Sequence, residues 1–392
     1  MGYRVLKVLC AAAGILLCQL PALSTPVDPE APALGRPGSS PVGTSTFDLT
    51  LAPRLRLSGA TEPRQIGVRL WYPAAAASGQ PATYRHVARF LDGGELAIAE
   101  QGIALADARP ASGSVPLVLL SHGYRGWNAH LSRLSEHLAS HGYMVAALDH
   151  RDAPVDSPAS FLMSFGHVLI DRARDQREAL AKLLAMRSDP ASPLRIADAN
   201  RIGLIGYSMG GYGAIATAGA DYDVASKVYA QLPGPTRQAL AGDAATAARV
   251  KALVLFAPWG GAPDNRVWQP AGLTQVRAPT LVIAGDQDDI VDYRQGVRWI
   301  FDNLSSADRH LLVYREARHN IAGNPVALTP DAPFAAVDAF HEPVWRMERI
   351  NAINQHFVTA FLDLQLKGDQ SKAAYLKVPK PVAGEGDWRS AW

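Results

Sequence analysis

Residues Arg201 to Gly213 read R-I-G-L-I-G-Y-S-M-G-G-Y-G, and this stretch decides the fold. Its first half is an apolar run typical of a buried strand, and its second half contains the pattern G-x-S-x-G. A serine on a sharp turn from a strand into a helix needs Gly206 and Gly210, because side chains there would collide where the backbone doubles back. The stretch therefore predicts that the Ser208 hydroxyl projects above a sheet as a nucleophile.

Further apolar runs indicate the rest of this sheet, since short continuous runs are typical of parallel strands buried on both faces. Together with the run quoted above they are Leu117 to Leu120, Met144 to Leu148, Ile202 to Ile205, Leu253 to Ala257, Leu281 to Ala284 and His310 to Tyr314. Helical periodicity over His130 to Ser140 and over Asp171 to Met186 separates some of them. The alternation predicts a doubly wound, mostly parallel α/β sheet within a single domain over residues 45–392.

Segments outside the parallel strands predict a hairpin and two long loops beside the sheet. Phe47 to Leu51 and Ile66 to Tyr72 alternate apolar and polar residues, which predicts an N-terminal antiparallel hairpin at the sheet edge. Arg151 to Val168 and Asp221 to Val250 are longer than ordinary connections, and long loops are often binding loops or lids. A small cap and plain surface decoration both remain open for the second of them.

The N-terminus resembles a targeting segment. Arg4 and Lys7 precede the apolar stretch Val8 to Leu17, which is shorter than the roughly 20 residues of a membrane span. We expect residues 1–24 to be a signal peptide cleaved near Ser24, so that the mature protein is periplasmic or secreted and not inserted in a membrane. An uncleaved anchor is the alternative. The Pro-, Gly- and Ser-rich residues 25–44 are expected to be a flexible lead-in.

Composition narrows the function classes further. Cys10 and Cys18 are the only cysteines and lie in the predicted signal peptide, which excludes disulfides, thiol catalysis and cysteine metal sites from the mature chain. The 38 basic and 36 acidic residues are interspersed and give a formal charge of +2, so no nucleic-acid partner is expected. The ligand is expected to be small or neutral.

An activated serine needs a base and an acid that orients it, in the chain order serine, acid, histidine. Pro279 to Val291 reads P-T-L-V-I-A-G-D-Q-D-D-I-V, a buried strand that ends in an acidic loop. Asp288 is the predicted acid. Asp286, Asp289 and Asp292 compete with it, the alternative for each being a solvated charge or a helix cap.

The predicted base is His319, which follows the last strand in E-A-R-H-N. That position lies at the carboxyl end of the sheet, where ligands bind in open α/β folds. His310 is the rival, but it begins the same strand and should lie at the opposite end. A structural or surface role suits it better.

Two backbone N–H groups are expected to stabilise the oxyanion, one after the nucleophile and one in the loop after the first parallel strand. Met209 supplies the first. The loop lies in Pro116 to Gly126, P-L-V-L-L-S-H-G-Y-R-G, where Gly123 allows the turn and Tyr124 supplies the second N–H. His122 is expected to stabilise this turn rather than transfer protons.

These motifs resemble a known branch of proteins. S-H-G-Y after a strand, E-H-L-A-S-H-G-Y-M-V-A-A-L-D-H at Glu136 to His150, G-Y-S-M-G-G and R-H-N-I-A-G look like the predicted dienelactone-hydrolase and platelet-activating-factor acetylhydrolase-like branch of α/β-hydrolases. The resemblance covers about Phe47 to Leu376 and implies the α/β-hydrolase fold. True dienelactone hydrolases use cysteine, whereas this chain has Ser208.

A second resemblance concerns the site. Tyr124 with Met209, and A-P-W at Ala257 to Trp259, are similar to bacterial cutinases and polyester hydrolases. This resemblance implies that Trp259 lines the acyl subsite and that Tyr124 binds substrate, although Trp259 as a plain core aromatic is an equal alternative. The chain departs from that group in its greater length, its two long loops and its lack of C-terminal cysteines.

The sequence thus predicts an exported serine carboxylic-ester hydrolase of carboxylesterase, lipase or cutinase-like type. Ser208, His319 and Asp288 would act through an acyl-enzyme on a small or polymeric ester, with no metal or organic cofactor. Two alternatives stay open. One is a serine peptidase on the same fold, and the other is a hydrolase-fold binding protein without turnover.

Overall fold

The computed structural model describes residues 33–90, 93–238, 240, 242–377 and 389–390. The predicted signal peptide, residues 1–24, lies outside the described residues, as do residues 25–32 of the expected lead-in. Within the rest of that lead-in, Ala33–Gly35 forms a single 3₁₀ turn and the first strand already begins at Val42. No helix in the described part of the chain is long and apolar enough to cross a membrane.

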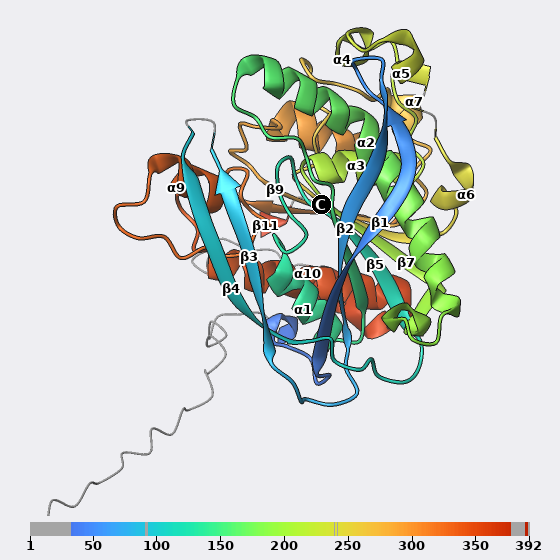
Figure 1. The fold of residues 1–392 in the computed structure, drawn as a ribbon, viewed down its shortest axis with the longest axis vertical. Coiled ribbons are helices and arrows are strands. Elements are labelled where there is room, and N and C mark those ends of the chain that lie inside the picture. The colour runs from blue at the N-terminus through green and yellow to red at the C-terminus, as the bar shows by residue number, and fades with distance from the viewer. Residues whose placement is uncertain (1–32, 91–92, 239, 241, 378–388, 391–392) are drawn as a thin grey trace, which may run out of the picture.

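One mixed sheet organises the molecule (Figure 1). Its strands are β1 (Val42–Leu55), β2 (Thr61–Pro73), β3 (Pro81–Arg89), β4 (Glu95–Ala106), β5 (Val115–Ser121), β6 (Met144–Asp149), β7 (Ala197–Tyr207), β8 (Val250–Phe256), β9 (Thr280–Gly285), β10 (Arg309–Tyr314) and β11 (Arg389–Ser390). Their spatial order is β11-β10-β9-β8-β7-β5-β6-β2-β1-β4-β3. Strands β5 to β10 are mutually parallel, so all six predicted apolar runs form the parallel part of the sheet.

The N-terminal strands differ from the prediction in one respect. β1 and β2 pair antiparallel as expected, but they do not form the edge of the sheet. β2 pairs with β6, β1 pairs with β4, and the hairpin of β3 and β4 forms the edge instead. That hairpin alternates exposed and covered side chains along both strands, so only one face of it is packed against the protein.

Helices cover both faces of the sheet. They are α1 (Ser132–Ser140), α2 (Pro158–Ala185), α3 (Met209–Thr217), α4 (Lys227–Ala230), α5 (Gly234–Gln238), α6 (Ala244–Ala247), α7 (Pro270–Leu273), α8 (Arg298–Asn303), α9 (Phe334–Phe340), α10 (Met347–Lys367) and α11 (Ala373–Leu376). α2 packs on α3, and α1 packs on α10. This is the predicted doubly wound α/β arrangement, which the structure confirms.

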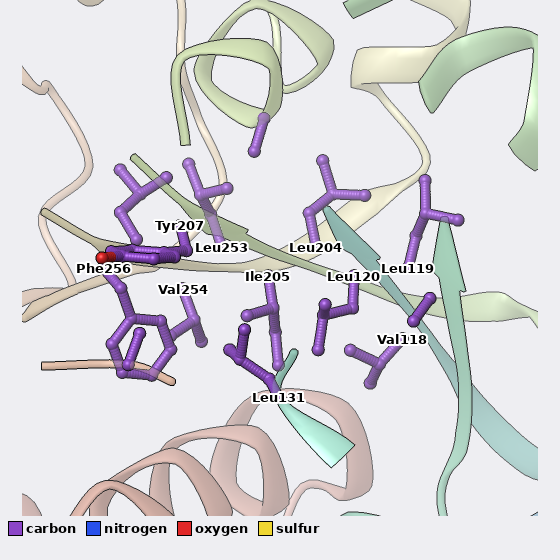
Figure 2. Packing of buried hydrophobic residues seen from close by; sticks show 14 of the residues in the cluster. Val118, Leu119, Leu120, Leu131, Leu204, Ile205, Tyr207, Leu253, Val254 and Phe256 are labelled. Atoms are coloured by element: carbon purple, nitrogen blue, oxygen red, sulfur yellow. The ribbon is translucent and has the colours of Figure 1, made fainter. Parts of the chain in front are cut away.

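The core forms because successive side chains of the central strands point to opposite faces. In Figure 2, Leu119, Leu204 and Leu253 lie on one side of the strands, and Leu120 and Ile205 lie on the other. All are at most 2% exposed, so both faces of the sheet are covered. The continuous apolar runs follow from this double burial.

Both long segments contain helices. Residues 158–168 of the first predicted loop form the opening turns of α2, which therefore begins 13 residues before the predicted helix start at Asp171. Ser157 and Ser160 cap this helix reciprocally, and Pro158 occupies its first turn. The second segment contains α4, α5 and α6, of which Tyr229 in α4 donates or accepts a 2.6 Å hydrogen bond with Tyr212 in α3.

The fold brings one set of loops together. Strand register aligns Ser121 with Gly206, Tyr207 with Phe256, and Gly285 with Tyr314. The parallel strands thus end at a common edge, and the segments after them carry the residues singled out from the sequence: Tyr124, Ser208, Trp259, Asp288 and His319.

Candidate active site

Ser208 occupies the turn between β7 and α3. Its backbone angles, φ 53° and ψ −115°, lie in a region that residues with a side chain rarely adopt. The turn requires glycine at both neighbouring positions. A Cβ on Gly206 would overlap the Gly210 carbonyl, and a Cβ on Gly210 would overlap the Ser121 carbonyl. The Ser208 N–H donates to the Phe256 carbonyl at 2.9 Å, which ties the turn to β8.

His319 lies between the serine and the acid. Its Nε2 is 3.1 Å from Ser208 Oγ, and its Nδ1 is 2.8 Å from Asp288 Oδ2. The other carboxylate oxygen of Asp288 accepts the backbone N–H groups of Ile290 and Val291 at 3.0 and 3.1 Å. Because an ionised carboxylate only accepts hydrogen bonds, Nδ1 carries the imidazole proton and Nε2 can accept the serine proton.

The three rival aspartates make other contacts. Asp286 accepts the N–H of Glu316 at 2.6 Å, and Asp289 forms an ion pair with Arg318 at 2.7 Å. Asp292 accepts two N–H groups at the start of the following helical turn, as a cap does. The structure brings only Asp288 of the four to His319.

His310 lies on β10, four residues before the strand ends at Tyr314. Its Nε2 is 2.8 Å from Asp308 Oδ1, beside the loop that leads into the strand. The strand therefore separates His310 from the edge that carries His319, as the sequence predicted.

A carboxylate that sequence reasoning did not single out holds the backbone around His319. Glu342 accepts the backbone N–H groups on both sides of His319, from Arg318 at 2.5 Å and from Asn320 at 2.6 Å. Burial raises the pKa of Glu342 while these N–H groups oppose the rise. Tyr207 adds a third restraint, because its hydroxyl donates to the His319 carbonyl at 3.1 Å.

The two predicted oxyanion donors lie on segments that approach each other. Met209 is the first residue of α3, directly after Ser208, and Tyr124 lies in the loop after β5. The loop passes close to Ser208 at Gly123, where an added Cβ would lie 3.3 Å from the Ser208 Cβ. Within the described residues, neither the Tyr124 nor the Met209 N–H donates to another protein group.

Aromatic side chains form a wall beside these loops. Trp259 follows β8, is 7% exposed and packs edge-on between Phe165 and Tyr212, with ring centroids 5.3 and 5.7 Å apart. Phe165 also packs edge-on against Tyr124 at 5.5 Å, and Phe161 does so at 5.9 Å. Sequence reasoning missed both phenylalanines because it interpreted their segment as a loop, and only the helical spacing of Phe161 and Phe165 indicates a shared face.

The arrangement places a serine hydroxyl and a buried carboxylate on either side of one imidazole, beside the segments that carry two backbone N–H groups. Such a set is suited to nucleophilic attack on a carbonyl. No group of three or more His, Cys, Asp or Glu residues able to hold a metal ion occurs in the described part of the chain.

Two family profiles match the chain. The family described as PET hydrolase-like matches residues 107–233, and the family described as serine aminopeptidase, S33, matches residues 265–325. The first range contains the oxyanion loop and Ser208, and the second contains Asp288 and His319.

Among curated proteins, the chain is similar to bacterial cutinases. Cutinase est1 of Thermobifida alba is 27% identical over 52% of this chain and 52% of its own length. Cutinase 2 of Thermobifida cellulosilytica is 27% identical over 48% of this chain and 54% of its own length. The chain thus spans about half the length of the curated relatives it matches.

A solved structure extends the likeness over most of the fold. A ferulic acid esterase from Streptomyces cinnamoneus superimposes with a TM-score of 0.60 and 26% identity, covering 88% of this chain and 96% of that one. Sheet topology and sequence likeness therefore agree. The chain belongs to the α/β-hydrolase superfamily and has features similar to those of cutinases and polyester hydrolases.

Proposed function

We propose that this protein hydrolyses carboxylic esters, with Ser208 as nucleophile, His319 as general base and Asp288 as the acid that orients the imidazole. The observation that carries the proposal is the continuous chain of contacts from Ser208 Oγ through His319 to Asp288, at 3.1 and 2.8 Å. Its relatives, which are described as cutinases and a ferulic acid esterase, support ester chemistry over other acyl transfers.

Acylation follows from the geometry. His319 Nε2 accepts the Ser208 proton as Oγ attacks the ester carbonyl, and the resulting imidazolium is stabilised by the buried Asp288 carboxylate. The N–H groups of Tyr124 and Met209 donate to the oxyanion. Nε2 then gives its proton to the departing alcohol, which leaves the acyl group on Ser208.

Deacylation uses the same groups with water as the nucleophile. His319 Nε2 accepts a proton from water, the hydroxide attacks the acyl carbonyl, and the proton returns to Ser208 Oγ as the carboxylic acid is released. The wall of Tyr124, Phe165 and Trp259 favours an apolar or aromatic group on the ester.

The experiment combines a substrate panel with a nucleophile variant. Nitrophenyl esters of increasing acyl length, an aromatic acyl ester and a polyester film would be compared with a matched anilide. We expect ester turnover, rapid labelling by a fluorophosphonate, and loss of both in Ser208→Ala, with kcat reduced by up to ~10⁶-fold.

The other outcomes distinguish the rival functions. Turnover of the anilide at a rate comparable to that of the esters would indicate a serine peptidase. The match of residues 265–325 to the serine aminopeptidase family is the observation that favours this alternative. A wild-type protein that neither turns over esters nor reacts with the phosphonate would be a binding protein. More than a tenth of wild-type activity in Ser208→Ala would move the nucleophile elsewhere.

We also infer that the protein is exported, on the basis of Arg4, Lys7 and the apolar stretch Val8 to Leu17. Mass spectrometry of protein secreted from a Gram-negative host should find an N-terminus near Thr25. An intact Met1 would show that the segment is an uncleaved anchor.

A further inference from the structure

Two side chains one turn apart on α2 contact both segments that carry the proposed oxyanion donors. Arg172 Nη2 donates to the Gly123 carbonyl at 3.2 Å, and Gln176 Nε2 donates to the Gly210 carbonyl at 3.1 Å. The helix lies close to α3 because Gly213 has no side chain: a Cβ there would lie 2.6 Å from Gln176 Nε2 and 2.8 Å from Arg172 Cγ. α2 is therefore in contact with the oxyanion loop and the nucleophile turn together.

The Gly123 carbonyl has a second side-chain partner in His122. Nε2 of His122 accepts the backbone N–H of His150 at 3.2 Å, so the imidazole proton is on Nδ1, which donates to the Gly123 carbonyl at 2.6 Å. Burial, with Arg172 and His150 adding to it, lowers the pKa of His122 to about 3, which keeps the ring neutral. Gly126 makes room for this ring, since a Cβ there would lie 2.9 Å from Nδ1.

These contacts determine where the next N–H points. In a trans peptide the carbonyl and the following N–H point in opposite directions, and the described residues contain no cis peptide. Arg172, His122 and the backbone N–H of Gly126, which lies 3.2 Å from the same oxygen, together hold the Gly123 carbonyl. The Tyr124 N–H of the same peptide plane therefore points away from Arg172 and His122. Gly123 itself lies next to Ser208, since a Cβ on it would be 3.3 Å from the serine Cβ.

Asp152 holds the other end of the loop. Its Oδ2 accepts Arg172 Nη2 at 2.8 Å and the backbone N–H of Arg125 at 2.8 Å. The Arg172 and Asp152 side chains are 1% and 4% exposed, so water competes little for this pair. Burial opposes ionisation of the carboxyl, yet the Arg172 guanidinium holds the pKa of Asp152 below its ordinary value.

We propose that Arg172, with His122 and Asp152, positions the oxyanion hole. The three side chains fix the Gly123–Tyr124 peptide plane so that the Tyr124 N–H is aimed at the developing oxyanion before substrate binds. Preorganised donors of this kind stabilise the transition state more than the ground state, because no reorientation is needed as charge develops. The inference rests on the proposed ester hydrolysis, since it assigns positioning residues to that same site.

The test uses Arg172→Met and the double variant Arg172→Met/Asp152→Asn. The double variant leaves no unpaired buried carboxylate, so it remains informative if the single variant folds poorly. Arg174→Met, two residues along the same helix and partly exposed, is the matched control. For each protein, kcat and KM on a nitrophenyl ester, inhibition by a boronic acid that forms a tetrahedral anion on serine, and the thermal midpoint would be measured.

We expect kcat to fall by ~10- to 100-fold in both Arg172 variants, which is less than the ~10²- to 10³-fold that loss of a whole oxyanion donor costs. The KM should change by less than about threefold. The boronate inhibition constant should rise in proportion to the loss of kcat/KM, while the substrate KM does not. Arg172→Lys, which keeps the charge and one donor, should recover part of the loss.

Two results would overturn the inference while the proposed function stands. One is a folded Arg172 variant with kcat within twofold of an active wild type, and the other is a fall in kcat with unchanged boronate affinity. An inert wild-type protein would instead show that the proposed function is wrong.

Discussion

Asp288 differs from its three neighbouring aspartates in how its two oxygens are used. One faces His319 at 2.8 Å and the other accepts backbone N–H groups, so the carboxylate has a single orientation. Asp289 instead pairs with Arg318 at a position where its side chain is 56% exposed. These contacts distinguish the proposed orienting acid from a residue in a surface ion pair, whose contribution to stability is small.

We expect Asp288→Asn to reduce kcat by ~10⁴-fold, because an amide in that position no longer selects the imidazole tautomer with the proton on Nδ1. Asp289→Asn is the matched control and should keep at least half of the activity. Steady-state kinetics of both variants on one nitrophenyl ester would decide the assignment. A larger loss at Asp289 would transfer the role to that residue.

Glu342 permits a second prediction about a single side chain. Its two oxygens accept the N–H groups of Arg318 and Asn320, and Gln can offer only one acceptor while placing an amide N–H against the other donor. Glu342→Gln should therefore lower kcat by about tenfold, with a smaller change in KM, because the His319 loop loses its fixed position.

Asp338→Asn is the control for that variant, since Asp338 pairs with the side chain of Arg318 and is 44% exposed. Its activity should stay within twofold of wild type. Equal losses in the two variants would mean that Glu342 acts through overall stability and not through the base.

Residues that lie in a local motif or follow a recognisable strand could be predicted from the sequence, whereas residues that act only through contacts with distant loops could not. Ser208 lies inside its own motif, and the sequence placed Asp288 and His319 directly after strands, where the structure brings their side chains together. Their catalytic roles stay predictions. Glu342 and Arg172 had no local signal, because each contacts a loop more than 20 residues away in the chain.

At the scale of elements, the opening turns of α2 add aromatic side chains to the candidate site. They carry Phe161 and Phe165 to Tyr124, and Phe165 onward to Trp259. The sequence Arg151 to Val168 was interpreted as a long connection, because helical spacing of apolar residues was recognised only from Asp171 onward. The same Ser157 and Pro158 in fact begin the helix as its cap and first turn.

Phe165→Ala should widen the aromatic wall and release Trp259 on one side. Loss of two edge-on ring contacts, each worth ~0.5–1.5 kcal/mol, should lower kcat/KM for a benzoate ester by about tenfold relative to an acetate ester. Leu162→Ala on the same helix is the control, because its side chain is 67% exposed. Equal specificity in Phe165→Ala and wild type would remove Phe165 from the substrate site.

The β3 and β4 hairpin shows why some strands escaped prediction. Its residues alternate, but charged and polar side chains interrupt the apolar ones, and most of its side chains are partly or fully exposed. The parallel strands were predicted correctly because burial on both faces leaves almost only apolar residues in them. Edge strands lack that constraint, so their sequence signal is weaker.

For the molecule as a whole, buried neutral histidines link folding to pH. Burial lowers the pKa of His130 to about 4 and, with a contribution from His141, that of His137 to about 3. The unfolded chain takes up protons on these groups below about pH 6.5, whereas the folded protein does not until pH 3 to 4. The unfolded state then binds more protons, so the free energy of unfolding must fall as the pH falls.

We expect the free energy of unfolding, measured by urea titration, to decrease between pH 6.5 and pH 4 by up to ~1.4 kcal/mol per pH unit for each such histidine. His137→Gln should reduce this slope, because glutamine does not titrate. Above pH 7 the variant and wild type should have the same, flat dependence. A slope unchanged by His137→Gln would mean that this histidine does not contribute.

The backbone conformation of Ser208 has a consequence for the heat resistance of the whole protein. At φ 53° and ψ −115° a side chain is strained by ~1–3 kcal/mol, whereas glycine accepts positive φ and loses only ~0.5–1 kcal/mol through its greater freedom when unfolded. Ser208→Gly should therefore melt ~2 °C above Ser208→Ala, which also lacks the hydroxyl but keeps the Cβ. Equal midpoints would show that the turn is unstrained.

If Ser208 is the nucleophile, as we propose, activity and thermal stability compete at this single position. A library selected only for survival on heating would accumulate glycine at residue 208 and become enriched in robust, inert proteins. Directed evolution of this scaffold for hot or prolonged use must therefore screen turnover in every round, since selection by heat alone would favour loss of the proposed nucleophile.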